Sequence, residues 1–262
     1  MAEDNNYVLG KGKLYFSRLI SGTQNPEGYR FIGDCKEFNI TFASTKLDHF
    51  SSTSGVKVKD KSVVLEVNRT GTIVTEEISS ENLALFFFGS SGSLTVAGAT
   101  VTAEPIADVI LDRYYPLGVS SANPGGARGV TYPGSGGTAF VVKKGVTVLT
   151  AGTDYAWDPI GCLLHILPGG TLVAGDDITV GYTTVSTTRE QVLSGTAAVE
   201  GALIYKSDNA EGANQDYAVP YVSLSPNGDY ALISDTWLAL SFSVEVLSRT
   251  GWPAVTVDGR PL

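Results

Sequence analysis

The sequence predicts an all-β protein with one short α-helix, on three observations. Hydrophobic residues make up 43% and charged residues 17% of the 262 residues, so the chain can bury a core and is not disordered. Thirty glycines and many serines and threonines separate short runs that are rich in β-branched residues, as in proteins with many strands and turns. Apolar and polar side chains alternate in the strongest runs, and this period of two is typical of strands with one buried face.

Two short strands are predicted first, at residues 13–19 and 29–32. The predicted centre of the fold follows, at residues 38–69. Residues 38–43 and 63–68 alternate apolar and polar side chains and predict two strands. The polar segment between them, residues 44–62, is much longer than the roughly two to five residues that connect the strands of a hairpin. We therefore interpret this segment as a long loop. Such a loop between strong strands is expected to contact another molecule, here the next copy of the same protein.

The second of these strands is predicted to continue through residues 72–75, with a bulge or bend at Gly71. Residues 79–89 predict the helix. Ser79 or Ser80 is expected to cap its N-terminus, and Gly89 to end it.

Near Pro105 the chain changes character, and residues 107–189 are predicted to be an inserted small β-sandwich of immunoglobulin-like type. A Gly/Pro/Ser-rich patch at residues 120–137 precedes several short strands. These strands are expected around Phe140, Val148, Tyr155, Leu164 and Val180. Residues 1–106 and 190–262 then form one discontinuous domain, since insertions are tolerated at exposed loops.

Strong alternation resumes after the insert. Residues 198–206 and 217–224 predict strands, and Pro220 marks an edge or a bulge in the latter. Residues 237–247 form the longest clean alternating run.

The sequence predicts no catalytic residue, cofactor or metal ligand. The two histidines, His49 and His165, belong to no triad or zinc-spaced motif. Cys35 and Cys162 are expected to be reduced, buried thiols. The acidic clusters around residues 154–158 and 175–177 are interpreted as turns, not calcium sites.

The net charge and the lack of targeting segments limit the classes of partner that the sequence predicts. The net charge of −9 counts against a surface that binds nucleic acid by neutralising phosphates. The first residues lack the pattern of a signal peptide, and no apolar run is long enough to cross a bilayer. We therefore expect no membrane partner.

Several segments resemble the tail tube (major tail) protein of long-tailed bacteriophages. The resemblance covers about residues 7–100 and 196–262. Its most specific parts are LDHFSS (residues 47–52) and SSENLALFFFG (residues 79–89), and WLALSFSVEVL (residues 237–247) fits the same family.

The resemblance implies a β-sandwich or barrel with one helix, shared with the inner tubes of contractile systems and type VI secretion. It implies hexameric rings whose sheets join edge to edge and stack into a hollow tube, which conducts DNA without binding it specifically. The implied partners are further copies of the chain, a tape measure protein, and tail terminator and distal tail proteins. The implied location is the virion tail, assembled in the host cytoplasm.

Two sets of residues are predicted to carry this function. The long loop is expected to reach the adjacent ring through Lys46, Leu47, Asp48, His49, Phe50, Val56, Lys57, Lys59 and Lys61. A polar and acidic face is expected to line the lumen with Asn39, Thr41, Glu66, Asn68, Ser241, Ser243 and Glu245.

The insert is expected to project outward, which would obstruct a sheath and favours a non-contractile tail. The alternative hypothesis is a carbohydrate- or cell-surface-binding module of a virion, with Trp157, Tyr155 and Tyr132 as a sugar platform. A hydrolase is a much weaker third hypothesis, because no catalytic motif supports it.

Overall fold

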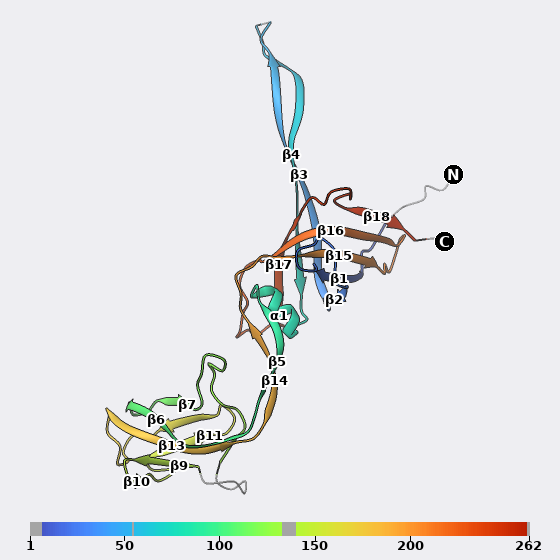
Figure 1. Ribbon diagram of the computed structural model, residues 1–262. Helices are drawn as coiled ribbons and strands as arrows, with labels where there is room; N and C mark the ends of the chain where they lie inside the picture. Colours follow the sequence, from blue (N-terminus) through green and yellow to red (C-terminus); the bar gives the residue numbers. More distant parts are fainter. Residues whose placement is uncertain (1–6, 54, 133–139, 261–262) are drawn as a thin grey trace. The chain divides into compact units, whose positions relative to one another are not determined.

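The computed structural model describes residues 7–53, 55–132 and 140–260, and within them the protein is all-β with a single short helix, as predicted (Figure 1). The chain divides into two compact units. The first unit is Met1–Gly92 with Gln191–Leu262, and the second unit is Ser93–Glu190. The insertion point predicted at residue 107 falls inside strand β6 (Ala99–Val109), so the second unit begins earlier in the chain.

The first unit is built on one antiparallel sheet with the strand order β2-β1-β15-β16-β17-β4-β3, and β18 pairs separately with β16. Its strands are β1 (Gly12–Arg18), β2 (Arg30–Phe31), β3 (Cys35–Ser51), β4 (Val58–Thr75), β15 (Val199–Ser207), β16 (Gln215–Pro226), β17 (Leu240–Val246) and β18 (Thr256–Gly259).

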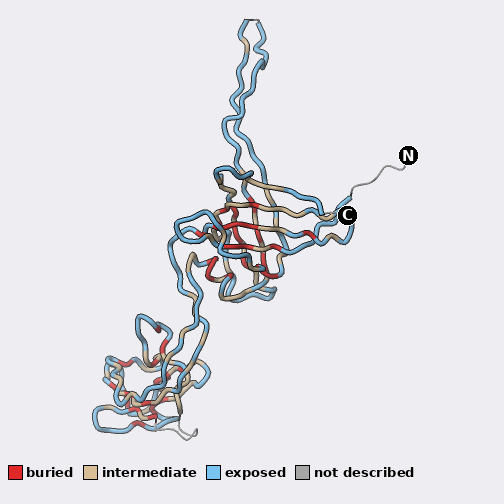
Figure 2. The backbone as a smooth tube through the Cα atoms, turned by 45° about the vertical axis from the view of Figure 1, so that its right-hand side comes forward, coloured by how far each residue is buried: buried red, intermediate tan, exposed pale blue. Residues whose placement is uncertain are grey.

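This sheet curls around a single apolar core. Phe16 of β1, Ile73 of β4 and Phe242 of β17 belong to the same buried cluster, although β1 and β4 are several strands apart in the sheet. Figure 2 shows the buried residues concentrated on these strands. The alternation in the sequence therefore reports one face that is packed inward and one that is not.

Helix α1 (Ser80–Phe86) closes this core. The Ser79 hydroxyl accepts the N–H of Asn82 at 3.2 Å and caps the helix. The buried Asn82 amide donates to the carbonyl of Ile32 at 2.7 Å and so fixes the helix against the chain near β2. Leu85 and Phe86 supply apolar side chains to the core.

The helix ends at Phe86, before the end predicted at Gly89. Phe88, not Gly89, takes the left-handed conformation, with φ of 52°. The N–H of Phe88 donates to Leu85 and that of Gly89 to Ala84, which is the paired closure typical of a Schellman motif. Gly89 is needed for a different reason, because a Cβ there would meet the carbonyl oxygen of Leu193.

The second unit contains two sheets around its own core. Its five-stranded sheet has the order β10-β9-β13-β6 with β8 added to β13, and its three-stranded sheet has the order β11-β12-β7. Its strands are β6, β7 (Tyr114–Pro116), β8 (Val130–Thr131), β9 (Val141–Lys144), β10 (Thr147–Val148), β11 (Tyr155–Asp158), β12 (Leu163–Ile166) and β13 (Asp176–Thr184). The chain enters through β5 (Ser90–Val96) and returns through β14 (Thr187–Leu193), which pair with each other.

Both sheets contribute to that core, through residues such as Val180 of β13 and Leu164 of β12. Asp154 is buried and accepts the backbone N–H groups of Thr150 at 2.7 Å and Thr171 at 2.6 Å. These bonds lower its pKa. Asp154 therefore fixes a turn, as predicted. The immunoglobulin-like character of the insert stays a prediction.

Three local predictions have clear outcomes. The register of β15 against β16 shifts at Pro220, so this proline marks a bulge. The bulge predicted at Gly71 is wrong, because Gly71 pairs regularly with Ile40; a Cβ there would clash with the Asn39 carbonyl. The last long strand begins at Leu240, later than predicted.

The cysteines are free thiols in the described chain. Cys162 is buried and Cys35 is partly buried. Burial raises the pKa of Cys35 to about 11, so this thiol stays protonated and unreactive at neutral pH.

A cluster at Asp216 generates a testable pH dependence. Its carboxylate accepts hydrogen bonds from Arg260 and Lys206, both at 2.8 Å, which lower its pKa from 3.8 to about 2. The pKa of Asp216 is lower in the folded protein than in the unfolded chain. The stabilisation of the folded state by this carboxylate is therefore complete above pH 3.8, its ordinary pKa, and is lost as the pH falls towards 2.

We expect Asp216→Asn to lower the free energy of unfolding at neutral pH by up to about 1 kcal/mol, and this difference to vanish near pH 2. Urea denaturation followed by circular dichroism across this range measures it. Asp235→Asn, an exposed loop acid, is the control. A difference independent of pH contradicts the assignment.

Candidate self-assembly surface

The most unusual feature of the first unit is the length of its β3–β4 hairpin. The two strands pair from Cys35 opposite Thr75 to Ser51 opposite Val58, but β17 pairs with β4 only as far as Thr70. Residues 42–69 therefore extend beyond the sheet as a two-stranded hairpin, here called the arm (Figure 1).

The arm corrects the prediction of a long loop. Residues 44–51 and 58–62, assigned to the loop from their polar composition, continue the two strands. Strand β3 ends at Ser51, and strand β4 begins at Val58. The alternation fades here because neither face of the arm is buried within the subunit, as Figure 2 shows.

The arm exposes many large apolar side chains. They are Phe42, Leu47, Phe50, Val56, Val58, Val63, Val64, Leu65 and Val67. Val56 is 73% exposed and Leu47 62%. A two-stranded hairpin is marginally stable in water, and a large exposed apolar surface marks an interaction site. The arm therefore has the composition of a segment that is covered in an assembly.

Polar contacts hold the outer half of the arm in register. Asp48 accepts hydrogen bonds from Lys59 and Ser62, both at 2.6 Å. These bonds, with Lys59 the largest influence, lower the pKa of Asp48. The Nδ1 atom of His49 lies 2.6 Å from Asp60. Lys59, Asp48 and His49 are thus occupied within the arm.

Other predicted loop residues remain available for a partner. In the described part of the chain, Lys46, Lys57 and Lys61 form no salt bridge within 4.0 Å. Lys46 still lies close enough to Asp48 to lower its pKa. Lys57 and Lys61 are therefore the basic groups most accessible to another molecule.

The predicted lumen residues fall on the sheet face opposite the core. Thr70 lies between Thr41 and Glu245, and Thr72 lies between Asn39 and Ser243. The intervening residues of β17 are buried in the core. The structure thus brings together Asn39, Thr41, Ser241, Ser243 and Glu245.

Glu66 and Asn68 do not join this group in the sheet. They follow the same alternation along β4 but lie on the arm, where β17 no longer pairs with β4. The polar face also contains Glu200 and Ser223, which the sequence prediction missed, since Glu200 pairs with Ser223 and Ser223 with Glu245. The alternation of residues 217–224 already indicates that Ser223 lies on the polar face, because it stands between Val222 and Leu224, which are buried.

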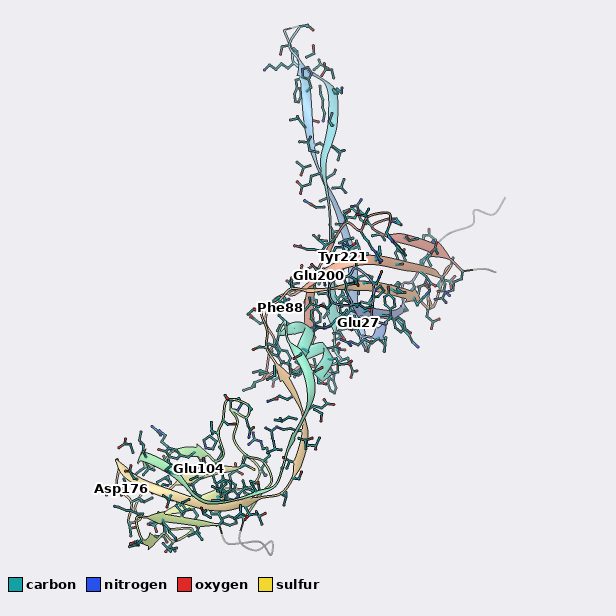
Figure 3. The ribbon with its side chains drawn as sticks, in the orientation of Figure 1. Glu27, Phe88, Glu104, Asp176, Glu200 and Tyr221 are labelled. Atoms are coloured by element: carbon teal, nitrogen blue, oxygen red, sulfur yellow. The ribbon has the colours of Figure 1, made fainter. Side chains whose placement is uncertain are left out.

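Glu200 has a specific partner on this face. Figure 3 shows it beside Tyr221. Burial and a hydrogen bond to Glu200 raise the pKa of Tyr221. The Tyr221 hydroxyl therefore stays a neutral donor that orients this carboxylate.

The sheet also ends in an open edge. β3, with 17 residues, is the last strand of the order, and in the described chain it pairs with β4 alone. The opposite end carries only the two residues of β2. A long unpaired edge readily accepts a further strand, and among the described residues β3 has such an edge.

The proposed sugar platform is not an exposed surface. Tyr155 is 4% exposed, and the ring of Trp157 packs 4.9 Å from Phe140 and 6.4 Å from Tyr132. All of these rings belong to the core cluster of the second unit or pack against it. Tyr155 is therefore covered, while Trp157 and Tyr132 are only partly buried.

Each histidine lies within hydrogen-bond distance of one carboxylate, and the two histidines belong to different units. His165 bonds to Asp112 at 2.9 Å and stacks on Tyr114 at 4.2 Å, while His49 lies on the arm of the other unit. Residues 7–53, 55–132 and 140–260 contain no group of three or more histidine, cysteine or acidic residues that could hold a metal.

The fold and surface define an all-β protein with a projecting, apolar hairpin and an open-edged sheet. A family described as "protein of unknown function UCP028589" matches residues 7–256, and the chain belongs to this family. A comparison with curated proteins finds no match. No helix in the described chain has the length and apolar character needed to cross a membrane.

The exposed arm generates a prediction about dynamics. In the isolated subunit, we expect the amides of β3 and β4 on the arm to exchange hydrogen on the order of a hundredfold faster than those opposite β17, because little burial opposes local opening. Hydrogen-exchange mass spectrometry at a concentration too low for assembly measures this. Residues 71–75, paired with β17, are the internal control. Equal protection of both regions contradicts the analysis.

Proposed function

We propose that this protein is the structural subunit of a bacteriophage tail tube, in which hexameric rings of identical copies stack into a hollow, DNA-conducting tube. The observation that carries the proposal is the arm, a two-stranded hairpin that exposes large apolar side chains to solvent. The sequence resemblance supports the same function. The tape measure, tail terminator and distal tail proteins are then the other partners, and the virion tail is the location.

Apolar burial is the main energetic argument for stacking through the arm. Burying a large apolar side chain contributes about 1.5–3 kcal/mol, whereas an exposed ion pair contributes only about 0–1 kcal/mol. Association costs roughly 4–15 kcal/mol in lost freedom of motion. Several of the arm's apolar side chains together can offset that cost, while its lysines set register and orientation.

The sheet edges support ring formation. The free edge of β3 and the short β2 at the other end can pair between neighbouring copies and join the sheets into one continuous barrel. Pairing turns edges that would otherwise favour aggregation into an assembly surface.

The polar face supports a DNA-conducting lumen. Its residues Asn39, Thr41, Ser241 and Ser243 are uncharged, and Glu245 and Glu200 are acidic. DNA that slides past such a wall releases no counterions by contact, so it is not held. The net charge of −9 agrees with this role.

The second unit must then lie outside the tube, because a lumen that conducts DNA leaves no space for it. Units on the outer surface would obstruct a contractile sheath. We therefore propose that the tail is non-contractile.

Shortening the arm tests the proposed stacking. Ser44 and Val67 are directly opposed, so replacing residues 45–66 by Asn-Gly gives a two-residue hairpin turn. We expect a folded subunit that no longer forms tubes at any concentration, whereas the intact protein forms them as its concentration rises. Negative-stain microscopy and light scattering measure both.

The matched control removes comparable apolar side chains elsewhere. Val146 and Ile160 of the second unit are 97% and 93% exposed, and the double variant Val146→Ser, Ile160→Ser is expected to assemble normally. Normal tubes from the shortened-arm variant are incompatible with the proposed function of the arm.

Charge reversal on the polar face tests the proposed lumen. We expect Glu200→Lys with Glu245→Lys to leave tubes intact but to make them retain DNA in a salt-dependent manner, because lysines release counterions from DNA. Infectivity of particles built with this variant should fall by about tenfold or more. The variant Glu200→Gln, Glu245→Gln is the control. Unchanged DNA passage and infectivity remove these residues from the lumen.

A further inference from the structure

A second exposed apolar element lies between β16 and β17. In this segment, residues 227–239, Ile233 is 97% exposed, Trp237 86% and Leu232 78%. Large apolar side chains at such exposure on one connection mark an interaction surface. We call this segment the receptor loop.

Two contacts hold the start of the receptor loop against the rest of the first unit. The N–H of Asn227 donates to the carbonyl of Ser241 at 2.9 Å. Its Tyr230 ring lies 5.9 Å from Phe86 of helix α1. The apolar side chains are therefore presented from a fixed base.

An open groove lies beside the loop. It has a volume of about 480 Å³ and is lined by Glu76, Ile78, Thr236, Trp237 and Leu238. The carboxylate of Glu76 is already paired with Lys36 at 2.5 Å, so the groove offers a partner mainly the apolar side chains of Ile78, Trp237 and Leu238.

The arm has the complementary charge. The sequence from residue 207 to 248 contains no lysine or arginine, and the receptor loop carries Asp229 and Asp235. The outer arm combines Phe50 and Val56 with Lys57 and Lys61. One surface is apolar and acidic, and the other is apolar and basic.

The two surfaces lie at opposite ends of the same strand. Leu240, which follows the receptor loop, pairs with Thr75 at one end of β4, whereas Val58 lies at the arm tip. At about 3.3 Å per residue, the 18 residues of β4 span about 60 Å. The arm of one copy therefore cannot reach its own receptor loop.

We propose that the receptor loop and its groove bind the arm tip of a second copy of this chain, an assignment that rests on the proposed tube function. Phe50 and Val56 pack against Trp237 and Ile78. Lys57 and Lys61 face Asp229 and Asp235. Because the two surfaces differ, the contact is head-to-tail and repeats along a stack without closing.

A charge exchange tests this pairing. The variants Lys57→Glu with Lys61→Glu, and Asp229→Lys with Asp235→Lys, should each raise the concentration needed for stacking by about tenfold or more. All four changes together should restore it to within about threefold of the intact protein. Sedimentation of tubes across a concentration series measures these values. Asp208→Lys with Glu211→Lys, exposed acids outside the loop, controls for net charge. No rescue in the fourfold variant overturns the pairing.

Mixing two defective subunits provides the second test. The Ile233→Ser, Trp237→Ser variant keeps an arm but loses the receptor, and the shortened-arm subunit keeps only the receptor. Both changed loop residues are exposed, so the loop variant should fold, as circular dichroism checks. Alone, neither should stack; mixed, they should form two-layer particles that do not extend, seen by negative-stain microscopy.

The outcomes separate the two proposals. If the loop variant forms normal tubes while the shortened-arm variant does not, the receptor assignment is wrong and the tube function stands. If the mixture yields no two-layer particles, the loop serves another contact and the assignment is again overturned. If the shortened-arm subunit itself forms tubes, the proposed role of the arm fails first.

Discussion

Backbone pairing between β3 and β4 is the interaction on which the other features depend. At one end the hairpin belongs to the curled sheet, where Ile73 is fully buried and Thr75 pairs with both Cys35 and Leu240. At the other end it leaves the sheet and keeps only its own cross-strand bonds. A single hairpin thus connects the buried core to apolar side chains that are exposed in the subunit.

The side-chain contacts across the two strands of the arm's outer half are polar, and the arm also exposes large apolar side chains to solvent. Asp48 with Lys59 and Ser62, and His49 with Asp60, hold register across the two strands. Ion pairs in solvent contribute little stability, so they cannot replace a third strand. They disfavour other registers of β3 against β4. They do not involve Phe50 or Leu47, whose side chains are exposed.

Sequence reasoning predicted most strands that have a buried face, and on the arm, which has none, it predicted residues 63–68 but missed residues 44–51 and 58–62. Phe242 and Val244 alternate with serines because one side of β17 packs on the core. On the arm no face packs on the core, so alternate positions need not be apolar. Polar residues such as Asp48 and Ser62, which pair across the two strands, therefore led to the prediction of a loop. Likewise, Phe88 takes a conformation that glycine prefers, and only its tertiary setting, packed against the core, shows why. The sequence predicted that Tyr155 and Trp157 form a sugar-binding surface, because aromatic residues occur both in such surfaces and in the core of a small domain.

In the proposed pairing of the arm with the receptor loop, the direction of β4 determines what kind of assembly the copies build. If the arm and the receptor loop lay at the same end of the strand, two copies could satisfy each other as a closed dimer. They lie at opposite ends, so each contact that forms leaves one arm and one receptor unfilled. Further copies can then add at either end until a different protein covers each free surface. The proposed pairing therefore gives a linear stack of defined polarity, and this follows from the positions at which one hairpin begins and ends, without any property of DNA or of a phage particle.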